Sequence, residues 1–124
     1  MDNIEPESSL VRQLHDEAMK YATQAYITLL QDKDSLVGIE DARIACQFEE
    51  QAARLIPYNP ESEPTRSILY RSAATLAVWA KEYDKSLELI KIGSTANTPP
   101  VLVKEFNALF RNAVDAKKQM EKNK

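Results

Sequence analysis

Apolar side chains recur at intervals of three and four residues along five segments of this 124-residue chain. That spacing follows one face of an α-helix, which turns once every 3.6 residues. The segments cover residues 9–31, 39–56, 64–80, 83–92 and 99–120. Only two glycines occur, which argues against tight β-hairpins and glycine-rich phosphate loops. We therefore predict an all-α protein of five antiparallel helices.

The breaks between these segments indicate one domain. Three prolines between residues 57 and 64 mark the clearest break, but the break is too short for a domain linker. Gly93 is expected to end the fourth helix, and Thr98 to cap the fifth. Residues 1–8 and 121–124 lack an apolar stripe and are expected to fray, which leaves a single helical domain at 9–120.

Cysteine content and hydropathy indicate the compartment. Cys46 is the only cysteine, so no intramolecular disulfide can form. The chain opens with acidic and polar residues, unlike the basic and apolar start of a secretory signal. The longest apolar run, residues 73–80, is far shorter than the roughly 20 residues that span a bilayer. We expect a soluble, cytoplasmic protein with no membrane partner.

The residue types and spacings that carry catalysis are missing. His15 is the only histidine and is expected on a polar surface, while Cys46 falls on an apolar stripe, where cysteine is usually inert. Asp32 and Asp34 suggest a calcium loop, but the glycine and glutamate that such a loop needs do not follow. We expect no enzyme activity, no metal site and no cofactor.

Charge is distributed unevenly along the chain. Residues 1–63 carry a balance of −8 and residues 64–124 a balance of +5. The two halves either attract each other within the fold or form a surface for an oppositely charged partner. The second half combines basic and aromatic residues, but a pI of about 5.2 argues against nucleic acid as a partner.

Residues 67–93 resemble one tetratricopeptide repeat, a pair of antiparallel helices with small and bulky residues at set positions. Lys81 stands at the turn position where the family usually has glycine, and Ala77 at a tyrosine position. The other matching positions are Tyr70, Ala73, Ala74, Tyr83, Ser86, Ile90, Gly93 and Pro99. A weaker upstream copy shows Ala18, Tyr21, Ala52 and Pro57, with a longer turn than the family has. A generic five-helix bundle is the alternative.

The resemblance implies two helix pairs followed by a capping helix. In the family, the first helix of each pair lines a concave groove that takes a peptide or helix of another protein. Transferred by position, the partner-binding residues are Ile68, Arg71, Thr75, Val78 and Trp79. Two of these side chains have an alternative role. Trp79 packs against the fifth helix in that reading, and Arg71 forms a plain surface ion pair.

The sequence thus favours a non-catalytic adaptor or scaffold that mediates protein–protein interaction. A small acidic inhibitor or antitoxin-like protein, whose first half masks a basic site on an enzyme or toxin, is the alternative. Self-association into a homo-oligomer through the oppositely charged halves is a third hypothesis.

Overall fold

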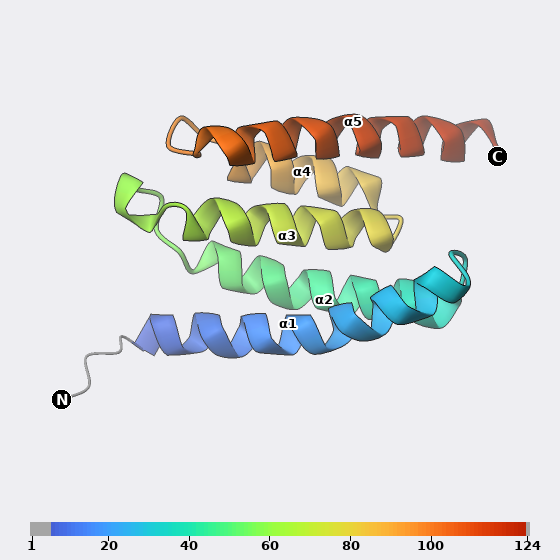
Figure 1. Cartoon of the computed structure of the whole chain (residues 1–124), viewed down its shortest axis with the longest axis horizontal. Coiled ribbons are helices and arrows are strands. Elements are labelled where there is room, and N and C mark those ends of the chain that lie inside the picture. The colour runs from blue at the N-terminus through green and yellow to red at the C-terminus, as the bar shows by residue number, and fades with distance from the viewer. Residues whose placement is uncertain (1–5, 124) are drawn as a thin grey trace.

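Five α-helices joined by short turns make up the computed structural model, which describes residues 6–123 (Figure 1). They are α1 (Pro6–Gln31), α2 (Leu36–Arg54), α3 (Thr65–Trp79), α4 (Tyr83–Gly93) and α5 (Pro100–Lys122), with the 3-10 helix η1 (Pro60–Ser62) before α3. Each α-helix packs against the next one in the chain, and α5 also contacts α3. The predicted all-α fold of five helices packed as consecutive neighbours is confirmed.

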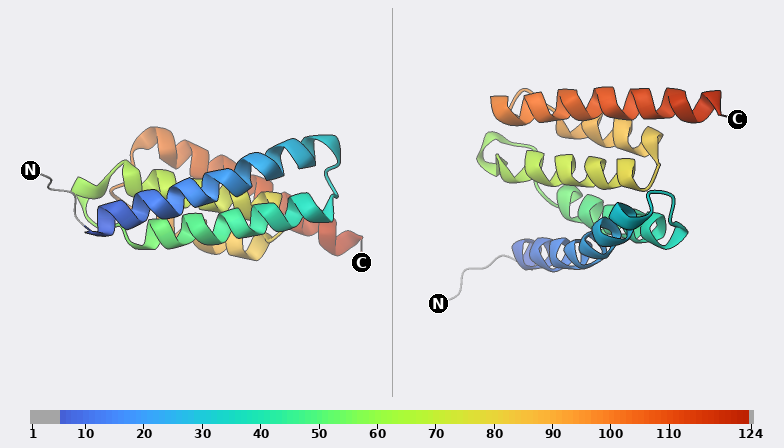
Figure 2. Two further views of the ribbon diagram at one scale, coloured as in Figure 1. Left: turned by 90° about the horizontal axis from the view of Figure 1, so that it is seen from below. Right: turned by 45° about the vertical axis from the view of Figure 1, so that its right-hand side comes forward.

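The helices stack in chain order, with α1 and α5 at opposite ends of the stack (Figures 1 and 2). Helices α1, α3 and α5 run in the same direction, and α2 and α4 run back between them (Figure 1). One side of the stack is therefore formed by three parallel helices.

The helix ends differ from the expected ones at several points. Helix α1 already begins at Pro6 and α5 continues to Lys122, so residues 6–8 and 121–122 are helical rather than frayed. The expected fraying of residues 1–5 and of Lys124 lies outside the described residues. Helix α2 begins at Leu36 instead of residue 39, because the Ser35 hydroxyl accepts a hydrogen bond from the Gly38 N–H at 3.2 Å.

Gly93 ends α4 as predicted, whereas Thr98 does not cap α5. Gly93 is the last residue of α4 and has no left-handed backbone. Because glycine has no side chain, Tyr70 of α3 can lie close to it. A Cβ added at residue 93 would overlap the Cβ of Tyr70. Thr98 does not cap α5; its buried hydroxyl accepts from the Thr95 N–H at 2.9 Å and from the Ser67 hydroxyl at 3.1 Å.

Alanines allow α3 and α4 to approach each other closely. Ala73, Ala74 and Ala77 are fully buried, and the Ser86 hydroxyl donates to the Ala74 carbonyl at 2.9 Å. On α4, Leu89 is fully buried and Ile90 is buried, whereas Tyr83 and Leu87 are only partly buried.

The turn between α3 and α4 contains Lys81, whose φ of 61° is left-handed. No other non-glycine residue in the described part of the chain has a positive φ. Glycine adopts this conformation without the steric penalty that a Cβ brings. Lys81 therefore has the backbone conformation that glycine favours, at the position where the tetratricopeptide pattern has glycine.

Candidate binding groove

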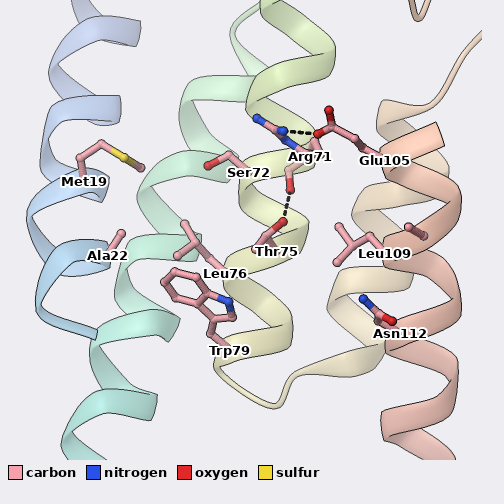
Figure 3. A pocket seen from close by; sticks show the side chains of 11 residues that line it. Met19, Ala22, Arg71, Ser72, Thr75, Leu76, Trp79, Glu105, Leu109 and Asn112 are labelled. Atoms are coloured by element: carbon pink, nitrogen blue, oxygen red, sulfur yellow. Dashed lines mark hydrogen bonds and ion pairs between the residues drawn. The ribbon is translucent and has the colours of Figure 1, made fainter. Parts of the chain in front are cut away.

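An open groove of approximately 480 Å³ lies between α1, α3 and α5 (Figure 3). Helix α3 contributes its floor, and α1 and α5 contribute its two walls (Figure 3). The residues that line it are Met19, Ala22, Arg71, Ser72, Thr75, Leu76, Trp79, Glu105, Ala108, Leu109 and Asn112. We call this the central groove.

Helical spacing brings three of the five predicted binding residues into the central groove. Arg71, Thr75 and Trp79 are four residues apart on α3, so their side chains follow one face of that helix. The two remaining residues, Ile68 and Val78, line separate hollows. Contact of these two residues with a partner stays a prediction.

One hollow lies at each end of the central groove, between α1 and α3. The hollow that contains Ile68 is lined by Val11, Arg12, His15, Ile56, Thr65, Ile68 and Leu69. The hollow that contains Val78 is lined by Tyr26, Leu29, Leu30, Lys33, Val78, Trp79, Lys81 and Tyr83. Trp79 lines both the second hollow and the central groove, so these two are neighbours along α1.

Arg71 and Glu105 form an ion pair across the central groove, from α3 to α5 (Figure 3). Both side chains remain partly exposed. The Thr75 hydroxyl donates to the Arg71 carbonyl at 2.9 Å, within α3. The guanidinium is thus held at the groove by a partner that an incoming carboxylate could replace.

Trp79 packs on α1 and also faces the groove. Its ring centroid lies 6.0 Å from that of Tyr26, with the two planes tilted by 35°. The side chain also packs against buried core residues, yet it remains partly exposed. Trp79 therefore has both a packing role, chiefly towards α1, and a surface that a partner can cover.

Acidic and basic side chains lie next to one another where α1 and α3 end: Asp32, Asp34 and Glu82 accompany Lys33 and Lys81. The ammonium groups of Lys81 and Lys33 lie 2.6 and 3.4 Å from the two carboxylate oxygens of Asp34. Hydrogen bonding to Lys81, and then to Lys33, holds the pKa of Asp34 below its ordinary value. Lys33 is 86% exposed, and a second carboxylate, that of Asp32, accepts a hydrogen bond from the Asp34 N–H at 3.0 Å in the same turn.

His15 is not the free surface residue that its sequence context suggests. Its Nδ1 lies 2.8 Å from Oε1 of Glu49, and the Glu49 side chain is fully buried. Because a carboxylate only accepts, His15 donates this hydrogen bond and thereby links α1 to α2. No local signal identifies the pair, since its members are 34 residues apart.

Arg66, one of the basic residues of the second half of the chain, is buried. Its guanidinium carbon lies 5.1 and 4.7 Å from the ring centroids of Tyr58 and Tyr70. Its nitrogens donate to the carbonyls of Ile92 and Gly93 at 3.4 and 3.5 Å, at the C-terminal end of α4. A cation there stabilises the helix end, so Arg66 has a structural role.

The described residues offer little for catalysis or metal binding. Cys46 donates its thiol hydrogen to the Ala73 carbonyl at 3.3 Å, and burial raises its pKa to about 12. Within residues 6–123, no three histidine, cysteine, aspartate or glutamate side chains gather as metal ligands. In the same range, no helix has the length and apolar character needed to cross a bilayer.

No protein-family model, curated protein or solved structure matches this chain.

Proposed function

We propose that this protein is a non-catalytic interaction module that binds a peptide or helix of a partner protein in the central groove. One observation carries the proposal: three parallel helices line one open groove, and the groove contains Arg71 and Trp79. Arginine and tryptophan are among the residues that contribute most to binding energy at protein interfaces.

Exposed apolar side chains next to the groove support a binding role. Tyr26 and Leu30 of α1 are 53% and 69% exposed, and both line the hollow that continues from Trp79. Covering such side chains with a partner releases water from apolar surface, which favours association. The apolar surface therefore extends the groove along α1.

The same geometry supports a tetratricopeptide-like origin. Helices α1 with α2 and α3 with α4 form two antiparallel pairs, and α5 follows as a capping helix. The left-handed Lys81 and the close approach at Gly93 occur at two positions of the family pattern. We place this adaptor in the cytoplasm, where a single cysteine stays reduced.

Affinity capture from the native host, quantified by mass spectrometry, tests the proposal. Arg71→Ala should weaken capture of the bound partner by about 1–3 kcal/mol, because the groove loses a charged contact. The melting temperature should change little, since the Arg71–Glu105 pair is partly exposed. Arg111→Ala on the exposed surface of α5, outside the central groove, is the matched control and should bind normally.

The acidic-inhibitor hypothesis has less support. Several carboxylates of α1 and α2 already have cationic partners: Glu17 pairs with Lys20 at 2.7 Å, and Glu40 pairs with Arg43. Glu50 pairs with both Arg54 and Lys85. If charge reversals on α1 and α2 abolish capture while Arg71→Ala leaves it unchanged, the acidic surface replaces the groove as the binding site.

A further inference from the structure

Aromatic side chains from three helices meet in the hollow that contains Val78. Tyr26 comes from α1, Trp79 from α3 and Tyr83 from α4. The hollow measures approximately 300 Å³, at the lower end of the ~300–1,000 Å³ typical of ligand sites, so it has room for one ring system. Its other lining residues are aliphatic or basic: Leu29, Leu30, Val78, Lys33 and Lys81. We call this the aromatic hollow.

The three rings leave surface uncovered in the aromatic hollow. The ring centroids of Tyr26 and Trp79 lie 6.0 Å apart, so these two side chains contact each other. Even so, the Tyr26 side chain is more than half exposed, and Trp79 and Tyr83 are partly exposed. Leu30 beside them is largely exposed. A further apolar group can therefore pack against these side chains.

An aromatic group suits this surface better than an aliphatic group does. Aromatic rings attract one another in offset-stacked and edge-to-face arrangements, in addition to the gain from burying their area. A ring in the hollow would have three aromatic neighbours, Tyr26, Trp79 and Tyr83. An aliphatic side chain of the same size would gain from burial alone.

The charges around the aromatic hollow favour an uncharged ring. Lys33 and Lys81 line it, and both form ion pairs with Asp34. Asp32 and Glu82 lie in the same two turns, so three carboxylates accompany the two ammonium groups. Aromatic sites often take cations, but a cation here would meet two lysines. An anion would meet the carboxylates, so an uncharged group fits the site best.

The position of the aromatic hollow indicates the source of this ring. Trp79 lines both the hollow and the central groove, so a segment bound in the groove would pass beside the hollow. A small free molecule must offset its loss of translational freedom with the few contacts of one ring. A side chain of a longer segment shares that cost with the other contacts of the segment. The site therefore suits a partner side chain better than a free aromatic compound.

Building on the proposed function of the central groove, we infer that the aromatic hollow binds one uncharged aromatic side chain of the partner segment. The ring is that of a phenylalanine, tyrosine or tryptophan, and it packs against Tyr26, Trp79 and Tyr83. Aromatic side chains in such pockets contribute much of the binding energy at protein interfaces. The aromatic residue thus determines which segments the groove accepts.

Selection of peptides from a random 20-residue display library, with the full chain as bait, tests the inference. The enriched peptides should share one aromatic residue, and its replacement by leucine should weaken binding about tenfold. Trp79 is the only tryptophan of the chain, so its indole N–H gives a single NMR signal in the ¹⁵N-labelled protein. That signal should shift when a selected peptide binds. Enriched peptides without a shared aromatic residue, or an unchanged indole signal, overturn the inference.

A double-mutant cycle tests the contact between the peptide ring and Tyr26. Tyr26→Leu should weaken binding of the aromatic peptide about fivefold and leave binding of its leucine variant unchanged. Phe110→Leu is the matched control, because Phe110 is a half-exposed aromatic residue of α5 outside both the hollow and the groove. It should weaken neither peptide. If the effects of Tyr26→Leu and of the peptide substitution multiply independently, the ring does not contact Tyr26 and the inference is wrong.

Two further variants separate this inference from the proposed function. Thr75→Arg places a long cationic side chain on the floor of the central groove and should weaken every selected peptide at least about tenfold. Gln47→Arg adds the same charge at an exposed position of α2 outside the groove and should not. Loss with Thr75→Arg but no preference for an aromatic residue overturns only the aromatic side chain. Equal binding by both variants, or no enriched peptide, overturns the groove as well.

A free aromatic compound tests the source of the ring. Titration with p-cresol, followed by the Trp79 indole signal, should give a dissociation constant at least about a hundredfold higher than that of a selected peptide. If p-cresol binds as tightly as the peptide, the aromatic hollow is a site for a small molecule and the assignment to a partner side chain is overturned.

Discussion

Gly93→Ala measures how closely α4 approaches α3. A Cβ at residue 93 would overlap the Cβ of Tyr70, and would lie 3.0 Å from its Cγ and 3.1 Å from Cζ of Phe106. The Tyr70 Cβ moves only with the backbone of α3, so the overlap cannot be relieved by a rotamer change. Overpacking of this kind costs about 1–3 kcal/mol, while alanine recovers about 0.5–1 kcal/mol of helix propensity. Because the overlap cannot be relieved, we take the upper end of the overpacking range and expect a net loss of about 2 kcal/mol in the free energy of unfolding.

Gly38→Ala is the matched control, because the same substitution there meets a different neighbour. Its Cβ would lie 2.8 Å from Cδ2 of Leu29, which is the end of a flexible and partly exposed side chain. We expect a change of less than about 1 kcal/mol. Urea unfolding followed by far-UV circular dichroism gives both values. If Gly93→Ala is as stable as Gly38→Ala, the close packing of α3, α4 and α5 around residue 93 is refuted.

Three further substitutions or modifications test the packing. Lys81→Gly should be neutral or stabilising by up to about 1 kcal/mol in urea unfolding, because it relieves a left-handed residue, and it should be more stable than Lys81→Ala; the reverse order would contradict this turn geometry. Ala74→Leu should lose about 1–3 kcal/mol, since Ala74 is fully buried beneath α4, and a neutral result would place it at the surface. Cys46 should resist alkylation at pH 8 until the protein unfolds, because burial raises its pKa to about 12, and rapid labelling of the native protein would show an accessible thiol. Because the folded state keeps this proton above the ordinary pKa of 9.0, stability should also fall as pH rises from there towards 12.

The helices could be predicted because their apolar stripes are long and regular. The sequence predicts the start of α2 three residues too late, because the first turn of this helix has no apolar stripe. Leu36 and Val37 are 82% and 68% exposed, so they belong to no buried stripe. Gly93 ends α4 as the sequence predicts, but its close contact with Tyr70, a residue of another helix, was not predictable. Local propensity carries no information about that approach.

The site could be predicted only in part. Positions on α3 follow from the repeat pattern, which identified Arg71, Thr75 and Trp79. The walls depend on how α1 and α5 are rotated about their axes, which is set by packing between distant residues. On α5, the helical spacing of Glu105, Leu109 and Asn112 was an available signal that these residues share one face. The sequence contains no signal that predicts the buried contacts of His15 and Arg66.

Packing between consecutive helices also has a consequence for how fast the chain folds. Within the described residues, no side-chain hydrogen bond joins positions more than 47 residues apart, and that one links Lys81 to Asp34. The pairs His15–Glu49 and Arg71–Glu105 each span 34 residues. Short loops lose little entropy on closing, and helical proteins with such local contacts fold within microseconds to milliseconds. The same stacking that leaves a groove beside α3 therefore favours fast folding.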